Sequence, residues 1–157
     1  MKTVLFVCTA NIARSPMAEA LFNEIIDEKG LSGQFQARSA GNWARDGIPA
    51  PPDGQQVMRN RGLDTRSHLS REVTERMIED SSLVLTMETG HKEALQIEFP
   101  MYREKIFMLS EMVGEEMDID DPYMMGIEKY EDSAREIKNI LDEGMRKILE
   151  LAGEMGN

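Results

Sequence analysis

The sequence predicts a single α/β domain with a four-stranded parallel sheet flanked by helices on both faces. A chain of 157 residues with 41% apolar composition has the size and the apolar content for one core. Four segments that we interpret as strands, the first of them a continuous apolar and β-branched run, alternate with segments of helical periodicity. That alternation is typical of a parallel sheet covered on both sides. We expect one domain to span residues 1–157.

The first expected strand, residues 2–8, is continuously apolar after Lys2, as in a strand buried on both faces. A short polar turn follows, and then Ser15 and Pro16 are suited to the N-cap and the first position of a helix. Gly30 ends this helix. The apolar residues between them recur at helical spacing: Ala18, Leu21, Phe22, Ile25 and Ile26.

The remaining elements are expected in alternating order. Residues 35–40 form the second strand, which ends in Ser39-Ala40-Gly41. Helices over 53–61 and 71–80 precede a third strand at 82–87. A helix over 89–99, a fourth strand at 105–109 and a final helix over 127–151 complete the domain.

The composition excludes several function classes. A formal net charge of −11 repels nucleic acid and anionic membranes, so we expect neither as a partner. No apolar run approaches the roughly 20 residues of a membrane span. The chain has one cysteine and no cluster with metal-ligand spacing, so we expect no disulfide, no metal and no cofactor. A reducing, cytoplasmic location fits these features.

The segment after the first strand has the pattern of a phosphate-binding loop. Cys8 and Arg14 are separated by five residues, between a strand end and a helix start. A loop of this length can turn successive backbone N–H groups inward, and the helix N-terminus adds partial positive charge. The planar guanidinium of Arg14 can bind two phosphoryl oxygens at once. The loop consists of Thr9, Ala10, Asn11, Ile12, Ala13 and Ser15 around these two residues.

Cys8 is expected to be the nucleophile. The positive field of the loop favours a thiolate over a thiol, which makes the sulfur reactive at neutral pH. We expect Ser15, in addition to capping the helix, to donate its hydroxyl to the Cys8 sulfur. A proton donor is also required on the far side of the phosphoryl group. The candidate is Asp121, because Pro122 stiffens the backbone that carries it.

The two histidines, His68 and His91, are expected to be structural. Neither has a cysteine or a carboxylate at an obvious pairing distance in the sequence.

Taken together, these segments resemble the low-molecular-weight protein tyrosine phosphatases and the similar bacterial protein arginine phosphatases. The matching pieces occur in family order over nearly the whole chain: residues 7–19, Ser39-Ala40-Gly41, Leu85-Thr86-Met87 with His91-Lys92, and Asp121-Pro122-Tyr123. The resemblance implies a four-stranded parallel sheet and a two-step mechanism without metal. It also implies that the substrate is a phosphorylated protein and that the product is inorganic phosphate.

The same resemblance implies a role for each site residue. Cys8 forms a phosphocysteine, Arg14 and the loop amides bind phosphate, and Asp121 protonates the leaving group and then activates water. Asn11 braces the loop. Trp43 and Tyr123 are expected to wall the entrance, where an aromatic ring can stack.

Three positions depart from the family pattern. Ala10 stands where the family usually has glycine. We expect this to make the loop harder to form, because alanine tolerates positive φ poorly. Ala13 replaces a second cysteine, so Cys8 has no partner for a protective disulfide. Ile12 matches the tyrosine phosphatases, whereas the arginine phosphatases carry threonine there. We therefore expect phosphotyrosine as the substrate, with phosphoarginine as the alternative and a non-catalytic phosphate-binding module as a third reading.

Overall fold

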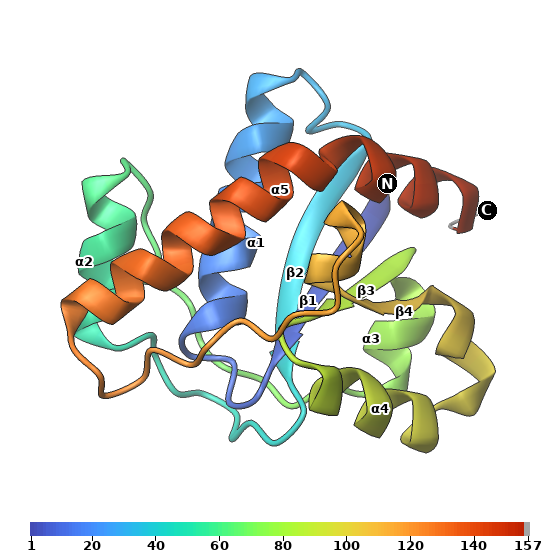
Figure 1. Cartoon of the computed structure of the whole chain (residues 1–157), viewed down its shortest axis with the longest axis horizontal. Coiled ribbons are helices and arrows are strands. Elements are labelled where there is room, and N and C mark those ends of the chain that lie inside the picture. Colours follow the sequence, from blue (N-terminus) through green and yellow to red (C-terminus); the bar gives the residue numbers. More distant parts are fainter. Residues whose placement is uncertain (156–157) are drawn as a thin grey trace.

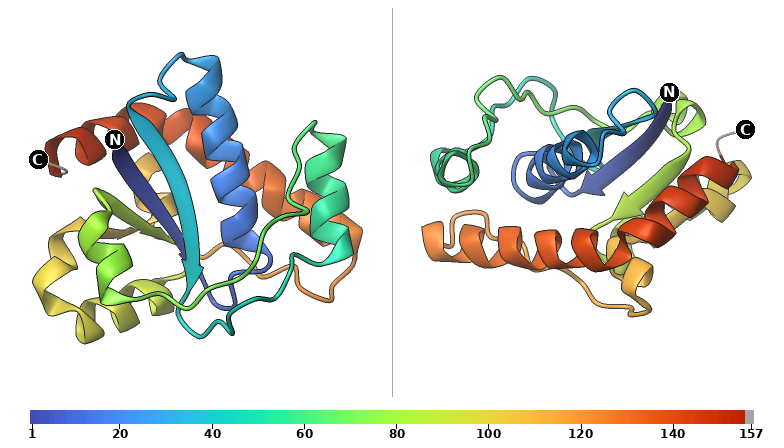
Figure 2. Two further views of the ribbon diagram at one scale, coloured as in Figure 1. Left: turned by 180° about the vertical axis from the view of Figure 1, so that it is seen from behind. Right: turned by 90° about the horizontal axis from the view of Figure 1, so that it is seen from above.

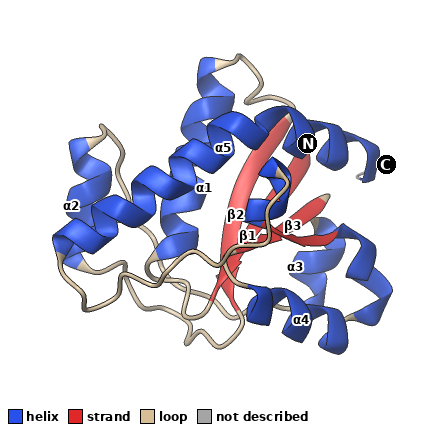
Figure 3. Cartoon of the chain, in the orientation of Figure 1, coloured by secondary structure: helices blue, strands red, loops and turns tan. Residues whose placement is uncertain are grey.

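The computed structural model of the protein describes residues 1–155, in which helices surround one central sheet (Figures 1 and 3). The elements are, in chain order, β1 (Lys2–Cys8), α1 (Arg14–Glu28), β2 (Phe35–Gly41), α2 (Pro52–Asn60), α3 (Glu75–Asp80), β3 (Leu83–Thr86), α4 (Thr89–Glu98), the 3-10 helix η1 (Pro100–Lys105), β4 (Ile106–Met108), the 3-10 helix η2 (Leu109–Val113) and α5 (Ile127–Met155). The two 3-10 helices are short elements that the sequence pattern did not indicate.

The sheet is parallel throughout and has the strand order β2-β1-β3-β4. The predicted α/β architecture with four parallel strands is therefore confirmed. β1 is a central strand: it pairs with β2 from Lys2 opposite Phe35 to Cys8 opposite Gly41, and with β3 on its other side. Because all strands run the same way, Cys8 and Gly41 end at the same edge of the sheet.

Helices cover both faces of the sheet. On one face Phe6 packs in a core shared with Phe22 of α1 and Leu141 of α5. On the other face Leu5 packs with Ile78 of α3 and Leu95 of α4. Figure 1 shows α5 crossing in front of the sheet, and the views in Figure 2 place the N-terminus and the end of α5 at the same end of the molecule. Alternate residues of β1 are thus buried on opposite faces, which explains its continuous apolar run.

The expected helix at 71–80 is shorter than predicted, because α3 begins only at Glu75. The residues before it are extended: Glu72 forms a bridge with Gly41, and the N–H of Val73 donates to the carbonyl of Gly41. Thr74 then caps the helix by accepting from the N–H of Met77. A contact with the end of β2 therefore takes precedence over local helical propensity in this segment.

The long loop between η2 and α5 returns to the carboxyl edge of the sheet. The N–H of Ile119 donates to the carbonyl of Met87, directly after β3, at 2.9 Å. This bond brings residues 118–121 beside the end of β1. Across residues 1–155, no helix combines the length and the apolar character needed to cross a membrane.

Candidate active site

The loop from Thr9 to Ala13 curls tightly between β1 and α1. Its left-handed residue is Asn11, with φ of 57°. Asparagine tolerates this conformation better than most residues. Ala10 does not have a positive φ, so the conformational objection to alanine at this position is wrong. The first N–H groups of a helix have no partner within the helix, and those of α1 begin where the loop ends.

Asn11 holds the loop in this shape from inside the protein. Its side-chain amide donates to Ser15 Oγ at 2.8 Å, and its Oδ1 accepts from the N–H of Arg71 at 3.0 Å. His68 Nε2 lies 2.7 Å from the backbone carbonyl of Asn11. Asn11 is fully buried. The bracing expected of Asn11 is thus carried by side-chain and backbone bonds to three segments.

Gly41 permits the close approach of β2 to this loop. A Cβ atom at position 41 would lie 2.6 Å from the carbonyl oxygen of Thr9 and 3.0 Å from the backbone nitrogen of Asn11. Both neighbours are backbone atoms that cannot move aside cheaply. Glycine at position 41 is therefore a packing requirement of the loop.

Cys8 lies at the floor of the loop and is buried. Its Sγ atom is 2.9 Å from Ser15 Oγ. Ser15 Oγ accepts from Asn11, and its own proton has two acceptors in reach, the Cys8 sulfur at 2.9 Å and the more distant carbonyl of Ala40 at 3.4 Å. The sequence suggested Ser15 as the helix N-cap, and this prediction is wrong. Helix α1 begins at Arg14, after Ala13, and has no side-chain cap. The tight loop starts the helix earlier and turns the Ser15 hydroxyl toward Cys8.

Arg14 is almost completely buried and is held along one edge of its guanidinium. Nη1 donates to Glu88 Oε2 and to the carbonyl of Ile119, the latter at 2.6 Å. Nη2 donates to Thr9 Oγ1 at 3.3 Å and lies 3.6 Å from Asp121 Oδ2. Nε is buried and has no hydrogen-bond partner among the described residues. A buried donor without a partner is costly, so the Nε edge is suited to an anionic ligand.

Glu88 is a site residue that the sequence analysis missed. It is the N-cap residue of α4: its carboxylate binds Arg14, and its backbone N–H donates to His91 Nδ1 at 3.2 Å. The only sequence signal was its place after Leu85-Thr86-Met87, at the end of a strand neighbouring β1.

Asp121 reaches the site on an exposed turn that is fastened at several points. Ser133 Oγ donates to the carbonyl of Asp120 at 3.3 Å, and the N–H of Tyr123 donates to Asp121 Oδ1 at 3.1 Å. Asp118 has a different task, because its Oδ1 accepts from the N–H of Thr89 at the start of α4. Of the three neighbouring aspartates, Asp121 is the one within 4 Å of Arg14.

The two expected wall residues are both exposed. The side chain of Trp43 is exposed, at 63% for the residue. Its backbone N–H donates to the carbonyl of Thr9 at 3.0 Å, which joins Trp43 directly to the loop. Tyr123 is 46% exposed and follows Asp121 by two residues. Ile12 is partly exposed within the loop. Trp43 thus adjoins the loop that follows Cys8, and Tyr123 adjoins the turn that carries Asp121.

His91 also touches the loop, which its sequence position did not indicate. Its Nε2 is 2.9 Å from Thr9 Oγ1, and its Nδ1 accepts from the N–H of Glu88 at 3.2 Å. Burial lowers the pKa of His91 to about 4, and the positive charge of Arg14 acts in the same direction. Both histidines therefore bond to the loop, from positions 57 and 82 residues away from their partners.

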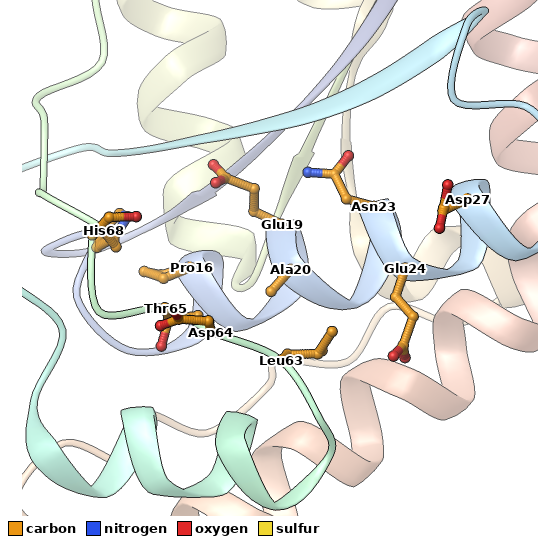
Figure 4. A pocket seen from close by; sticks show the side chains of 11 residues that line it. Pro16, Glu19, Ala20, Asn23, Glu24, Asp27, Leu63, Asp64, Thr65 and His68 are labelled. Atoms are coloured by element: carbon orange, nitrogen blue, oxygen red, sulfur yellow. The ribbon is translucent and has the colours of Figure 1, made fainter.

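A groove of about 540 Å³ lies elsewhere, between α1 and the segment from Leu63 to His68 (Figure 4). Its lining includes four carboxylates: Glu19, Glu24, Asp27 and Asp64. Its lining includes none of Cys8, Arg14 and Asp121, and negative charge of this density is unsuited to a phosphate. In the described part of the chain, no cluster of three or more His, Cys, Asp or Glu side chains could hold a metal ion.

A family model described as low molecular weight phosphotyrosine protein phosphatase matches residues 3–152 of the chain. A protein-arginine-phosphatase of Bacillus subtilis is 37% identical, over 88% of this chain and 91% of that protein. A probable low molecular weight protein-tyrosine-phosphatase of Ralstonia solanacearum, EpsP, is 35% identical over 94% of this chain and 97% of that protein.

Solved structures give the same picture. The crystal structure of a low molecular weight protein tyrosine phosphatase from T. tengcongensis superposes with a TM-score of 0.89 at 38% identity, covering 94% of this chain and 99% of that chain. The YwlE arginine phosphatase from Geobacillus stearothermophilus superposes with a TM-score of 0.86 at 33% identity, covering 98% of this chain and 97% of that chain. Similarity is therefore divided between two kinds of phosphatase.

Proposed function

The chain belongs to the low molecular weight phosphotyrosine protein phosphatase family, and from this we propose that it dephosphorylates phosphotyrosine in proteins with Cys8 as nucleophile. The family assignment makes it a phosphoric monoester hydrolase. The observation that carries the proposal is the arrangement around Cys8: a buried sulfur 2.9 Å from a hydroxyl, beside a guanidinium with a free, buried Nε.

In the first step, Arg14 and the backbone N–H groups of the loop bind the oxygens of the phosphoryl group. The Cys8 thiolate attacks phosphorus in line with the leaving oxygen, and the phosphorus–oxygen bond to tyrosine breaks as the phosphorus–sulfur bond forms. Asp121, at the rim of the site, donates its proton to the leaving phenolate oxygen. Ser15 stabilises the sulfur whenever it carries negative charge.

In the second step, Asp121 accepts a proton from a water molecule as that water attacks the phosphocysteine. The phosphorus–sulfur bond breaks, the Cys8 thiolate is restored, and inorganic phosphate leaves. Every step uses side chains of this chain, with the charge of the phosphoryl group balanced by Arg14.

The preference for phosphotyrosine is supported by the side chains around the loop. Ile12 is apolar and partly exposed, and Trp43 and Tyr123 are exposed aromatic residues near the entrance. An aromatic leaving group can bury its ring against such surfaces, whereas a phosphorylated guanidinium needs hydrogen-bond acceptors.

Phosphoarginine is the second candidate substrate, because two of the similar proteins are arginine phosphatases. One comparison separates the two: turnover of matched phosphotyrosine and phosphoarginine peptides by the unaltered protein and by Ile12→Thr. We expect the unaltered protein to favour phosphotyrosine and Ile12→Thr to shift the ratio toward phosphoarginine. A preference for phosphoarginine in the unaltered protein would overturn the substrate assignment, and no turnover of either peptide or of p-nitrophenyl phosphate would favour a non-catalytic phosphate-binding module.

A further inference from the structure

His91 occupies a buried position at the first turn of α4, and its hydrogen bonds define its tautomer. Nδ1 accepts the N–H of Glu88, so in the neutral ring the proton resides on Nε2. Nε2 therefore donates to Thr9 Oγ1 at 2.9 Å. The ring is 2% exposed, and burial keeps it neutral at physiological pH. His91 is thus a donor with a fixed direction, aimed at the first residue of the loop.

Thr9 passes this contact on to Arg14. Its Oγ1 accepts from His91 Nε2 and also from Arg14 Nη2 at 3.3 Å. A hydroxyl oxygen has two acceptor positions, and these two donors fill both. The place of Arg14 Nη2 therefore depends on a hydroxyl whose orientation is set by His91.

Glu88 makes a second connection between the same two residues. Its carboxylate accepts from Arg14 Nη1, and its backbone N–H donates to His91 Nδ1 at 3.2 Å. Both terminal nitrogens of Arg14 are thus bound to residues that His91 also hydrogen-bonds, Thr9 and Glu88. The Nε position remains free for a ligand.

His91 also contacts the segment that carries Trp43. Asn42 Nδ2 donates to the carbonyl of His91 at 3.2 Å, and the Trp43 and His91 rings lie 6.2 Å apart at 52°. The phosphate clamp and the aromatic wall therefore share one buried support.

We propose that His91 is a positioning residue of the phosphatase reaction, which orients the guanidinium of Arg14 through Thr9 and Glu88. The inference rests on the proposed function, in which Arg14 binds the phosphoryl group. It goes beyond a helix-capping role, because a cap needs only the acceptor at Nδ1, whereas orientation of Thr9 needs the donor at Nε2.

Two substitutions separate these tasks. His91→Asn places an amide oxygen near the position of Nδ1 and retains the cap, but it has no donor that reaches Thr9. His91→Gln carries an amide nitrogen near the position of Nε2 and retains the donor. A purely structural histidine predicts that both variants bind phosphate equally once folded.

The test measures inorganic phosphate affinity, by competition against p-nitrophenyl phosphate and by calorimetry. We expect His91→Asn and Thr9→Val each to weaken phosphate binding and kcat/KM by roughly 3- to 10-fold, which is the range for one lost hydrogen bond. His91→Gln should restore most of that loss. The double variant should be no weaker than Thr9→Val alone, because Thr9→Val already removes the acceptor of the His91 bond together with that of Arg14 Nη2. Lys92→Gln, which alters the neighbouring ion pair with Glu111, is the matched control and should bind phosphate normally.

The proposal is overturned if His91→Asn binds phosphate as the unaltered protein does, or if the His91→Asn and Thr9→Val losses multiply. Thermal unfolding of each variant shows whether it is folded, and Thr9→Val, at a partly exposed position, tests the same bond should the histidine variants not fold. Calorimetry measures phosphate binding without turnover. A wrong substrate or a wrong mechanism in the proposed function would therefore not change its result, and the two proposals can fail separately.

Discussion

The Sγ atom of Cys8 and the Oγ atom of Ser15 lie 2.9 Å apart, although six residues of the loop and helix start separate them in the chain. The contact exists because α1 begins at Arg14 and turns its second residue back under the loop. A hydroxyl so placed stabilises a thiolate before attack and again as the sulfur leaves phosphorus.

Ser15→Ala is therefore expected to slow the enzyme. Loss of a hydrogen bond to a charged group corresponds to about 10- to 100-fold in rate. Both kcat for p-nitrophenyl phosphate and the rate of Cys8 alkylation by iodoacetate at neutral pH should fall. Ser39→Ala, at another buried serine, is the control and should leave both rates near normal. Unchanged alkylation in Ser15→Ala would contradict the assigned role of this hydroxyl.

Gly41→Ala should damage the loop without touching any side chain of the site. The new methyl group would lie 2.6 Å from the carbonyl oxygen of Thr9, so the loop backbone must shift. Overpacking of this kind costs about 1–3 kcal/mol of unfolding free energy. We expect lower stability in urea and weaker phosphate binding. Gly33→Ala is a matched control, since no atom lies within 4 Å of its Cβ position and its φ is not positive; a similar effect in both variants would refute the packing argument.

The low pKa of His91 predicts a pH dependence of stability. In the folded protein burial lowers this pKa from 6.5 to about 4, so between these values the unfolded chain binds a proton that the folded chain does not. The contribution of neutral His91 to the free energy of unfolding is therefore fully present above about pH 6.5. It falls as the pH drops, by about 3 kcal/mol at pH 4. Urea unfolding at several pH values should give a shallower decline for His91→Asn than for the unaltered protein. Parallel declines would show that His91 does not titrate in this way.

Oxidation should inactivate the enzyme with little recovery. Cys8 is the only cysteine of the chain, and the loop residue before Arg14 is Ala13, which offers no second thiol. Peroxide transfers an oxygen atom to the Cys8 thiolate to form a sulfenic acid, which without a partner thiol is oxidised further to a sulfinic acid. We expect dithiothreitol to restore little activity after excess peroxide, and more in Ala13→Cys. Full recovery of the unaltered protein would show that the sulfenic acid is protected by other means.

The sequence was sufficient for the elements whose signals are local. The apolar run of β1, and the alternation of the other strands with helical segments, placed all four strands to within one or two residues. The sequence did not predict the start of a helix where contacts with distant residues determine it. Pairing of Glu72 with Gly41 delayed α3, and the tight loop moved the start of α1 ahead of Ser15.

The site shows the same division. Cys8, Arg14 and Asp121 could be nominated because a loop motif and an Asp-Pro pair mark them. Glu88 and His91 could not, since each meets the loop from more than 70 residues away, where spacing carries no information. The expected difficulty at Ala10 arose from assigning positive φ to the wrong residue, as Asn11 has it.

The central claim is that a phosphoryl group passes through the sulfur of Cys8. Its most direct test is rapid acid quenching of Asp121→Asn during turnover of a phosphotyrosine peptide, followed by mass spectrometry of the peptide that contains Cys8. This variant should retain attack by the thiolate but hydrolyse the intermediate slowly. We predict one phosphoryl group on Cys8, absent from Cys8→Ser treated in the same way; turnover by Cys8→Ser, or a phosphoryl group on another residue, would contradict the mechanism.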